Sequence, residues 1–248
     1  MTARDETTTD QAANQAANQA TDQVTATAAG RARKLLVFGA TGGTGVQLLA
    51  QALAAGHAVT AVVRDPGRVP APASRKADGP LTVLRGDVLD AAGWRSALAG
   101  HDAVLSCLGS TDRRRPTTVY SQGTLNILAA MHKAGVSRLL CLSSAGLETD
   151  PGIPLAQRLV TRLVIQRLYR HGYADMARME AVVRTDDTAW TVVRPPMLTD
   201  GPLTRRYRTA ENAHLTAATS LSRADLAHYL LTGVGDRRTH RAVVEVSY

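Results

Sequence analysis

Cysteine, lysine and long apolar runs are scarce in this chain of 248 residues. The two cysteines, Cys107 and Cys141, are too few for a disulfide scaffold, and neither a C-x-x-C pair nor a His/Cys cluster offers a metal site. No apolar run approaches the roughly 18 residues that a membrane-spanning helix needs. The first residues have neither the basic start nor the apolar stretch of a signal peptide. These absences predict a cytoplasmic protein that binds no metal and spans no membrane.

Basic residues outnumber acidic ones by 29 to 21, which gives a net charge of +8, and all but three of the basic residues are arginine. Residues 1–30 hold a net charge of −3, so residues 31–248 hold +11. Such an excess fits a nucleic acid, an anionic membrane or an anionic small ligand. Neither a recognition-helix motif nor an interleaving of aromatic and basic residues accompanies it. We therefore expect a small-molecule ligand, and neither a nucleic-acid nor a membrane partner.

The composition of the chain changes near residue 30. Residues 1–30 have almost no large apolar side chain and are expected to form a disordered extension. From Lys34 onward, short apolar runs alternate with segments of helical period, which predicts one domain over residues 31–248. Strands are expected at residues 35–38, 58–63, 81–84, 103–108, 139–142, 191–193 and 242–246, and helices at residues 43–55, 91–99, 117–134, 155–184 and 222–231. This alternation indicates an α/β fold with a doubly wound, Rossmann-type parallel sheet, whose C-terminal part forms the substrate pocket.

A glycine-rich turn separates the first expected strand from the first expected helix. Glycine permits a tight turn and a close approach of the backbone to a pyrophosphate, and the N–H groups at the helix N-terminus can then hold the anion. The strand expected before the turn and the amphipathic helix expected after it are the structural context that a phosphate-binding turn requires. The residues expected to bind the cofactor here are Gly39, Thr41, Gly42, Gly43, Thr44 and Gly45.

The end of the second expected strand bears on the choice of cofactor. Arg64 occupies the position where an acid would bind the ribose 2′-hydroxyl of NAD, and a guanidinium there suits the 2′-phosphate of NADP. Arg68 lies four residues further on and could join it. Asp65 leaves the alternative open, because a shift of one residue would restore an acid of the NAD type. We favour NADP, bound as NADPH.

Six short segments, taken in order and spacing, resemble the atypical short-chain dehydrogenase/reductases, a family that binds NAD(P)H. They are residues 38–45, 63–68, 86–89, 102–105, 116–119 and 194–196. The resemblance is strongest to the branch of biliverdin reductase B-like flavin reductases, and it extends from residue 34 to about residue 248. It implies further contacts with the cofactor at the carboxyl ends of strands. These are Asp87 and Val88 against the adenine, Leu108 and Gly109 under the ribose, Ser143 and Ser144 beside the nicotinamide, and Pro195 and Pro196 along its amide edge.

The positions of the lysines exclude the usual mechanism of short-chain dehydrogenases. That mechanism uses a tyrosine with a lysine four residues later, whose ammonium group lowers the phenol pKa. The chain has lysine only at residues 34, 76 and 133, and the residues four positions earlier are Gly30, Pro72 and Ala129. No pair of this kind is therefore available.

Two hydroxyl groups remain as candidates for a catalytic role. Tyr173 lies where the family's catalytic helix would begin, but Ala177 follows it at four, and packing is the alternative role. Ser144, at the end of the fifth expected strand, is expected near the hydride acceptor, with hydrogen bonding to the backbone as the alternative. Met197 follows the Pro-Pro pair where related proteins often have histidine, and is expected to contact a flat apolar substrate without donating a proton.

A substrate that spreads the incoming charge over a conjugated system does not need a strong proton donor. We therefore predict an NADPH-dependent oxidoreductase that transfers hydride to a planar acceptor such as a flavin, a quinone or a bilin. The alternative is a non-catalytic, NADP-sensing regulatory protein of the NmrA type, because the missing Tyr/Lys pair is compatible with both.

Overall fold

A computed structural model of the chain describes residues 31–70, 81–110, 115–148 and 169–248. Two of the predictions made from the sequence concern residues outside these ranges. The disordered extension expected over residues 1–30 lies outside the described residues, and so do residues 155–168 of the helix expected over 155–184.

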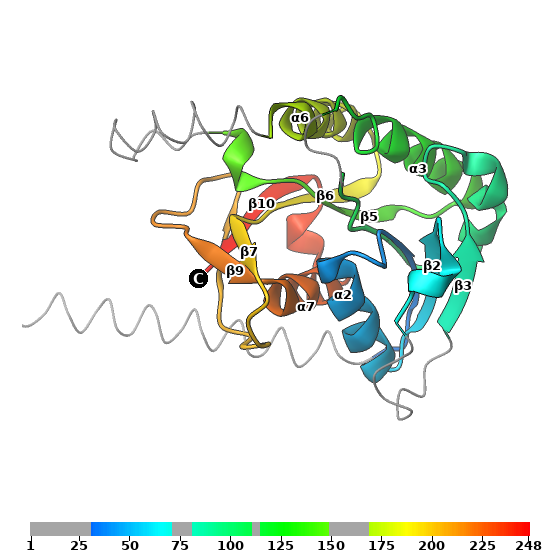
Figure 1. Cartoon of the computed structure of the whole chain (residues 1–248), viewed down its shortest axis with the longest axis horizontal. Coiled ribbons are helices and arrows are strands. Elements are labelled where there is room, and N and C mark those ends of the chain that lie inside the picture. The colour runs from blue at the N-terminus through cyan, green and yellow to red at the C-terminus, as the bar shows by residue number, and fades with distance from the viewer. Residues whose placement is uncertain (1–30, 71–80, 111–114, 149–168) are drawn as a thin grey trace, which may run out of the picture. The chain divides into compact units, whose positions relative to one another are not determined.

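An eight-stranded sheet forms the centre of the fold, and every strand except the edge strand β8 pairs in parallel (Figure 1). Its strands are β3 (Leu81–Arg85), β2 (Ala58–Val63), β1 (Lys34–Phe38), β4 (Ala103–Ser106), β5 (Arg138–Leu142), β6 (Ala189–Arg194), β10 (Ala242–Ser247) and β8 (Arg208–Glu211), in spatial order. The order reverses between β1 and β4, which is the switch point where open α/β sheets bind their ligands. The doubly wound Rossmann-type fold predicted from the sequence is confirmed.

Helices cover both faces of this sheet. Helices α2 (Gly43–Ala54) and α7 (Arg223–Gly233) lie on one face, and α3 (Ser121–Ala134) and α6 (Arg170–Arg184) lie on the other (Figure 1). Alternate residues of β1 therefore enter two different cores. Leu35 and Val37 belong to the core that contains α2 and α7, and Leu36 and Phe38 to the core that contains α3 and α6. A central strand covered on both faces must be apolar throughout, which explains its unbroken run of large side chains.

Residues 91–99 do not form the single helix that we expected. They form two short 3₁₀ turns, Ala91–Gly93 and Arg95–Leu98, on either side of a fully buried Trp94. The Asp90 carboxylate accepts a hydrogen bond from the N–H of Ala92 and caps the first of these turns. Trp94 donates its indole N–H to the carbonyl of Asp87 and packs edge-on against Phe38, at a centroid distance of 4.7 Å. The tryptophan thus fixes the chain that follows β3.

Side chains accept hydrogen bonds from the first backbone N–H groups of α7 and α3. Helix α7 begins after Ser222, where the sequence predicted a helix over residues 222–231, and the Ser222 hydroxyl accepts the N–H of Asp225. Helix α3 begins at Ser121, four residues later than expected, and Asp175 of α6 accepts the N–H groups of Tyr120 and Ser121. An acid from a distant helix therefore determines where α3 starts.

A small parallel sheet, which the sequence did not predict, consists of β7 (Met197–Thr199) and β9 (Ser220–Ser222). The antiparallel strand β8 was not predicted either. These strands have three or four residues each and no apolar run, so only their pairing in the folded chain identifies them. Within the described residues, no helix is long and apolar enough to cross a membrane.

Candidate cofactor and substrate site

The glycine-rich turn lies at the switch point of the sheet, between β1 and α2. Gly39 adopts a left-handed conformation with φ of +73°, and a Cβ atom there would overlap the carbonyl group of Cys107. A Cβ at Gly45 would overlap the carbonyl oxygen of Gly39. Both positions therefore require glycine, one for the turn and the other for the close packing of α2 on the end of β1.

The N-terminus of α2 has N–H groups that are available to a ligand. Gly42 precedes the helix and offers no side-chain cap, and the first helical hydrogen bond comes from the N–H of Val46. In the described part of the chain, the N–H groups of Gly43, Thr44 and Gly45 have no acceptor. Three unpaired donors at the positive end of a helix form a fitting cradle for a phosphate group.

Arg64 and Asp65 follow the end of β2 and differ in their contacts. The strand ends at Val63, and the Asp65 carboxylate accepts the N–H of Gly67 at 3.0 Å, which caps the short 3₁₀ turn Pro66–Arg68. Asp65 is therefore engaged by its own turn. Arg64 and Arg68 are exposed, and neither side chain forms an ion pair with another described residue. This geometry favours the arginines over Asp65 as the groups that meet the cofactor ribose.

The chain after β3 forms the expected adenine side of the site. The Asp87 carboxylate is exposed and accepts the N–H of Leu89 at 2.9 Å, which stabilises a tight turn. Val88 is buried beside Gly123 of α3, and its carbonyl accepts a hydrogen bond from Asn126. Asn126 and Trp94 thus hold the backbone at Val88 and Asp87, so the turn is rigid on both sides.

Tyr120 and Asp175 support the loop that contains Leu108 and Gly109. The Tyr120 hydroxyl accepts the N–H of Ser110 at 2.9 Å, and burial raises the pKa of this phenol. The Asp175 side chain is fully buried and also accepts the hydroxyl of Ser121. The sequence analysis missed both residues. A signal for Asp175 exists, because it lies four and eight residues before Met179 and Val183, on the buried row of α6.

A buried ion pair lies behind the expected nicotinamide position. Arg194, the last residue of β6, donates from Nε and Nη2 to the two carboxylate oxygens of Glu180 at 2.8 and 2.6 Å. Burial lowers the pKa of Arg194, but the hydrogen bonds to Glu180 and Glu148 outweigh it and raise the pKa on balance. Ser143 donates its hydroxyl to Glu180 at 2.7 Å. The Ser143 side chain therefore faces the protein interior, and its backbone is what borders the site.

Backbone hydrogen bonds hold the Pro-Pro segment that follows Arg194. The N–H of Ser143 donates to the carbonyl of Val193, and the N–H of Ala145 donates to the carbonyl of Pro195. These two hydrogen bonds continue the pairing of β5 with β6 beyond the strands themselves. Pro195 and Pro196 are thereby held beside Ser143 and Ser144, and their contacts with a nicotinamide stay a prediction.

Ser144 and Tyr173 come together at Gly146. A Cβ atom at Gly146 would lie 2.5 Å from the Tyr173 hydroxyl and 3.5 Å from the Ser144 hydroxyl. Ser144 Oγ accepts the N–H of Gly146 at 3.2 Å, and the Tyr173 ring stacks on Tyr169. The structure therefore brings two of the hydroxyl groups named from the sequence to one place, and Ser144 also makes the backbone hydrogen bond that was its alternative role.

Met197 lies at the open side of this region. Its side chain is 68% exposed, and β7 pairs it with Ser220. An exposed methionine next to the partly buried Pro196 is an apolar surface that a flat ligand can cover. The two cysteines take no part in such chemistry: burial raises the pKa of Cys107 to about 12 and also raises the pKa of Cys141, so both thiols stay protonated.

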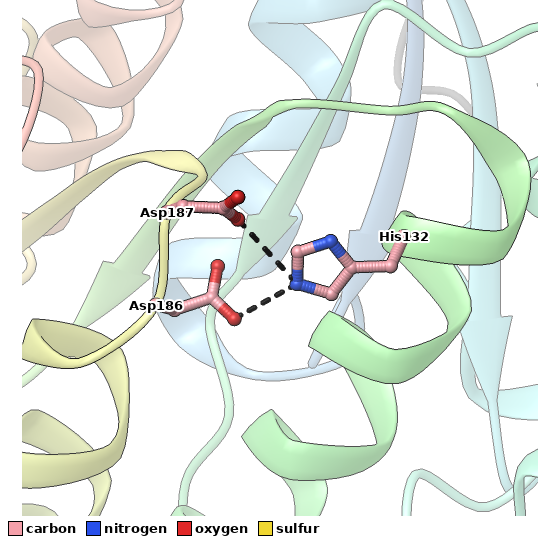
Figure 2. A group of neighbouring side chains, drawn as sticks. All are labelled: His132, Asp186 and Asp187. Carbon is pink, nitrogen blue, oxygen red and sulfur yellow. Dashed lines mark hydrogen bonds and ion pairs between the residues drawn. The ribbon is translucent and has the colours of Figure 1, made fainter.

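A His/Asp cluster lies at the opposite edge of the sheet. His132, in the last turn of α3, is 2.9 Å from Asp186 and 3.9 Å from Asp187, which precede β6 (Figure 2). Both carboxylates face the same imidazole nitrogen, and the hydrogen bond to Asp186 chiefly raises the pKa of His132. The cluster joins the C-terminus of α3 to the turn after α6. The expectation that the protein binds no metal stays a prediction.

Comparison with known proteins identifies the family. Residues 39–237 match the NAD(P)H-binding family, so the chain belongs to this family, and the family prediction from the motifs is confirmed. An uncharacterized chloroplastic protein of Arabidopsis thaliana is 30% identical over 70% of this chain and 62% of its own length. An isoflavone reductase homolog of Zea mays is 33% identical over 47% of this chain and 37% of its own length. The chain thus spans less than two thirds of these relatives.

Solved structures share the fold. A short-chain dehydrogenase/reductase from Veillonella parvula in complex with NADP superposes with a TM-score of 0.70 at 17% identity, over 88% of this chain and 95% of its own. ChuY, an anaerobilin reductase from Escherichia coli O157:H7, has a TM-score of 0.66 at 22% identity, over 86% of this chain and 96% of its own. At such identities the likeness extends to the fold alone.

Proposed function

We propose that the protein is an NADPH-dependent oxidoreductase that transfers hydride from the nicotinamide to a planar, conjugated acceptor such as a flavin, a quinone or a bilin. One observation supports this most directly. Two hydroxyl groups, those of Ser144 and Tyr173, lie together over Gly146 at the carboxyl end of β5. Among the described lysines, Lys34 begins β1 and Lys133 lies in the last turn of α3, both at the opposite edge of the sheet.

The residues of the cofactor site fit a phosphorylated dinucleotide. The unpaired N–H groups of Gly43, Thr44 and Gly45 would hold the pyrophosphate, and Arg64 and Arg68 the 2′-phosphate. The backbone of Ser143 and the Pro195–Pro196 segment would border the nicotinamide. When bound, NADPH supplies a hydride at C4 of its nicotinamide ring.

The protein's own groups would position the acceptor and provide one proton. Reduction of a conjugated acceptor adds a hydride and a proton, and the negative charge is delocalised before the proton arrives. The hydroxyl of Ser144 or Tyr173 can then donate a hydrogen bond to the acceptor and relay a proton from water. Met197 would cover one face of the ring system. Positioning and exclusion of water would account for most of the rate.

The test is NADPH oxidation, followed at 340 nm with FMN, a quinone and a bilin as separate acceptors. We expect turnover with at least one of them. Ser144→Ala and Tyr173→Phe should each lower kcat by up to about a hundredfold, the lower end of what a positioned proton donor contributes, with little change in KM. Tyr169→Phe is the matched control, because it retains the ring that stacks on Tyr173.

Three outcomes separate the possibilities. Loss of rate in the Ser144 and Tyr173 variants but not in the control supports the proposal. Unchanged turnover in Ser144→Ala with every acceptor refutes the assignment of the site. Tight NADP⁺ binding without turnover by the wild type would favour the non-catalytic sensor.

The preference for NADPH over NADH is tested with Arg64→Ala. A charged hydrogen bond to a phosphate contributes about 1.5 to 3 kcal/mol, so the variant should lose about ten- to a hundredfold in affinity for NADP⁺ and little for NAD⁺. Asp65→Asn is the control, and equal losses for both dinucleotides would contradict the assignment. The small-molecule substrate, the cytoplasmic location and the lack of nucleic-acid and membrane partners stay predictions.

A further inference from the structure

Arg223 lies across the first residue of α2. A Cβ atom at Gly43 would lie 2.6 Å from Cδ and 2.8 Å from Nε of Arg223. Because Gly43 has no side chain, the arginine of a helix 180 residues later in the chain can rest on the glycine-rich turn itself. Arg223 is the first residue of α7, which packs against α2, and Gln51 of α2 donates to the carbonyl of Ala224.

The guanidinium of Arg223 is paired with an exposed acid. Its Nη1 is 2.6 Å from Asp200 Oδ1, and the side chains of Arg223 and Asp200 are 29% and 90% exposed. An ion pair with a partner so open to solvent contributes little to stability, so a better anion can replace the carboxylate. A phosphate group is such an anion, because it accepts two parallel hydrogen bonds from a guanidinium.

The position of the pair explains why both groups stay near the turn. Asp200 follows β7 and Arg223 follows β9, and these two strands pair with each other, Thr199 opposite Ser222. Ser222 and Asp225 already cap α7, so Arg223 is not needed there. The Arg223 side chain is therefore held beside the unpaired N–H groups of α2 by the small sheet, with a replaceable partner.

We propose that Arg223 binds the pyrophosphate of the dinucleotide, and that Asp200 holds the guanidinium over Gly43 until the cofactor displaces it. This inference rests on the proposed NADPH binding. The guanidinium would release the Asp200 carboxylate and bind the pyrophosphate from the same position beside the turn. Since β7 also contains Met197, the exchange occurs next to the expected substrate side.

The experiment measures dissociation constants by isothermal titration calorimetry for two ligands. NADP⁺ has both the pyrophosphate and the 2′-phosphate, whereas adenosine 2′-monophosphate has only the latter. Arg223→Ala should weaken NADP⁺ by about ten- to a hundredfold and leave adenosine 2′-monophosphate unchanged. Arg64→Ala should weaken both ligands, and Arg223→Lys should give an intermediate loss for NADP⁺ because the charge remains.

A double-mutant cycle tests the position of the side chain. Gly43→Ala should displace the Arg223 side chain from the turn and weaken NADP⁺ binding. In an Arg223→Ala background, the same substitution should cause little further loss of affinity. Asp200→Asn alone should tighten NADP⁺ binding a few fold, and it should have no effect on NADP⁺ binding in an Arg223→Ala background. Thermal unfolding without ligand identifies any variant whose loss reflects misfolding.

The results also separate this inference from the function on which it rests. If the wild type binds NADP⁺ and Arg223→Ala binds it equally well, the inference is wrong and the proposed function stands. An equal loss for both ligands in Arg223→Ala would likewise overturn the pyrophosphate contact. If the wild type binds neither NADP⁺ nor NAD⁺, both fail.

Discussion

Two carboxylates contact the same nitrogen of Arg194, and their removal should have very different costs. Arg194 Nη2 is 2.6 Å from Glu180 and 2.8 Å from Glu148, so the two distances are nearly matched. Burial is not matched: the Glu180 side chain is 5% exposed and that of Glu148 is 53% exposed. The two carboxylates therefore compare a buried, bidentate partner of Arg194 with a half-exposed partner that accepts a single hydrogen bond.

The structure sets the expected magnitudes. Glu180→Ala leaves the buried guanidinium of Arg194 without its bidentate partner and the Ser143 hydroxyl without its acceptor. Breaking a buried pair in this way costs about 3 to 5 kcal/mol of unfolding free energy. Glu148→Ala removes a half-exposed partner and should cost about 1 kcal/mol or less.

Urea unfolding at pH 7, followed by the fluorescence of Trp94 and Trp190, measures both costs. The slope with urea concentration should be the same in the wild type and the variants, so that the midpoints report stability. Glu180→Gln, which retains one acceptor oxygen, should lie between the two alanine variants. Equal costs for Glu180→Ala and Glu148→Ala would refute the reasoning, since burial and bidentate pairing would then have no effect.

Three further predictions concern other parts of the fold. The hydrogen bond to Asp186 raises the pKa of His132, so this pairing stabilises the fold fully below the unfolded pKa of about 6.5, and the stabilisation is lost as the pH rises through the folded pKa. An NMR titration should give a lower pKa for His132 in Asp186→Asn than in the wild type, and an unchanged pKa would contradict this. Arg138→Met removes the buried donor to the carbonyls of Gly233 and Ala189 and should cost about 2 to 4 kcal/mol in urea unfolding, more than Arg138→Lys. Gly45→Ala should lower the melting temperature, because the added methyl group would overlap the Gly39 carbonyl. Gly172→Ala, in open space on α6, should not lower it. Equal melting temperatures for the two variants would contradict this.

The parts of the fold that the sequence predicted are those governed by local patterns. Apolar runs marked β1, β2 and β4 to β6 because strands covered on both faces must be apolar at every position. The helix from Gly43 was found from its period of 3.6 residues and the glycines before it. The single helix expected over residues 91–99 does not form, because Gly93 in its middle disfavours a helix and the helical period of this short segment is weak.

The parts of the site that the sequence missed depend on contacts between distant residues. Asp175 caps α3 from 54 residues away, and Glu180 receives Ser143 from 37 residues away. No spacing rule connects such pairs. A weaker signal was present, because Glu180 lies four residues after Met176 and next to Met179, at the border of the apolar face of α6. A charged residue at the border of an apolar face indicates a buried partner, but the sequence does not identify that partner.

The scarcity of lysine has a chemical consequence that the structure makes specific. Arg138 and Arg194 are buried and bind carbonyl or carboxylate groups, and Arg223 lies on the glycine-rich turn. A guanidinium holds anions firmly but does not release a proton near neutral pH, so none of these arginines can replace a catalytic lysine. Among the described residues, we expect the hydroxyls of Ser144 and Tyr173 to be the groups at the expected nicotinamide end that can pass a proton. Of the described lysines, neither Lys34 nor Lys133 lies beside these hydroxyls, so under the proposed function the acceptor itself carries the negative charge until the proton arrives. A conjugated ring system does this, and a simple ketone does not.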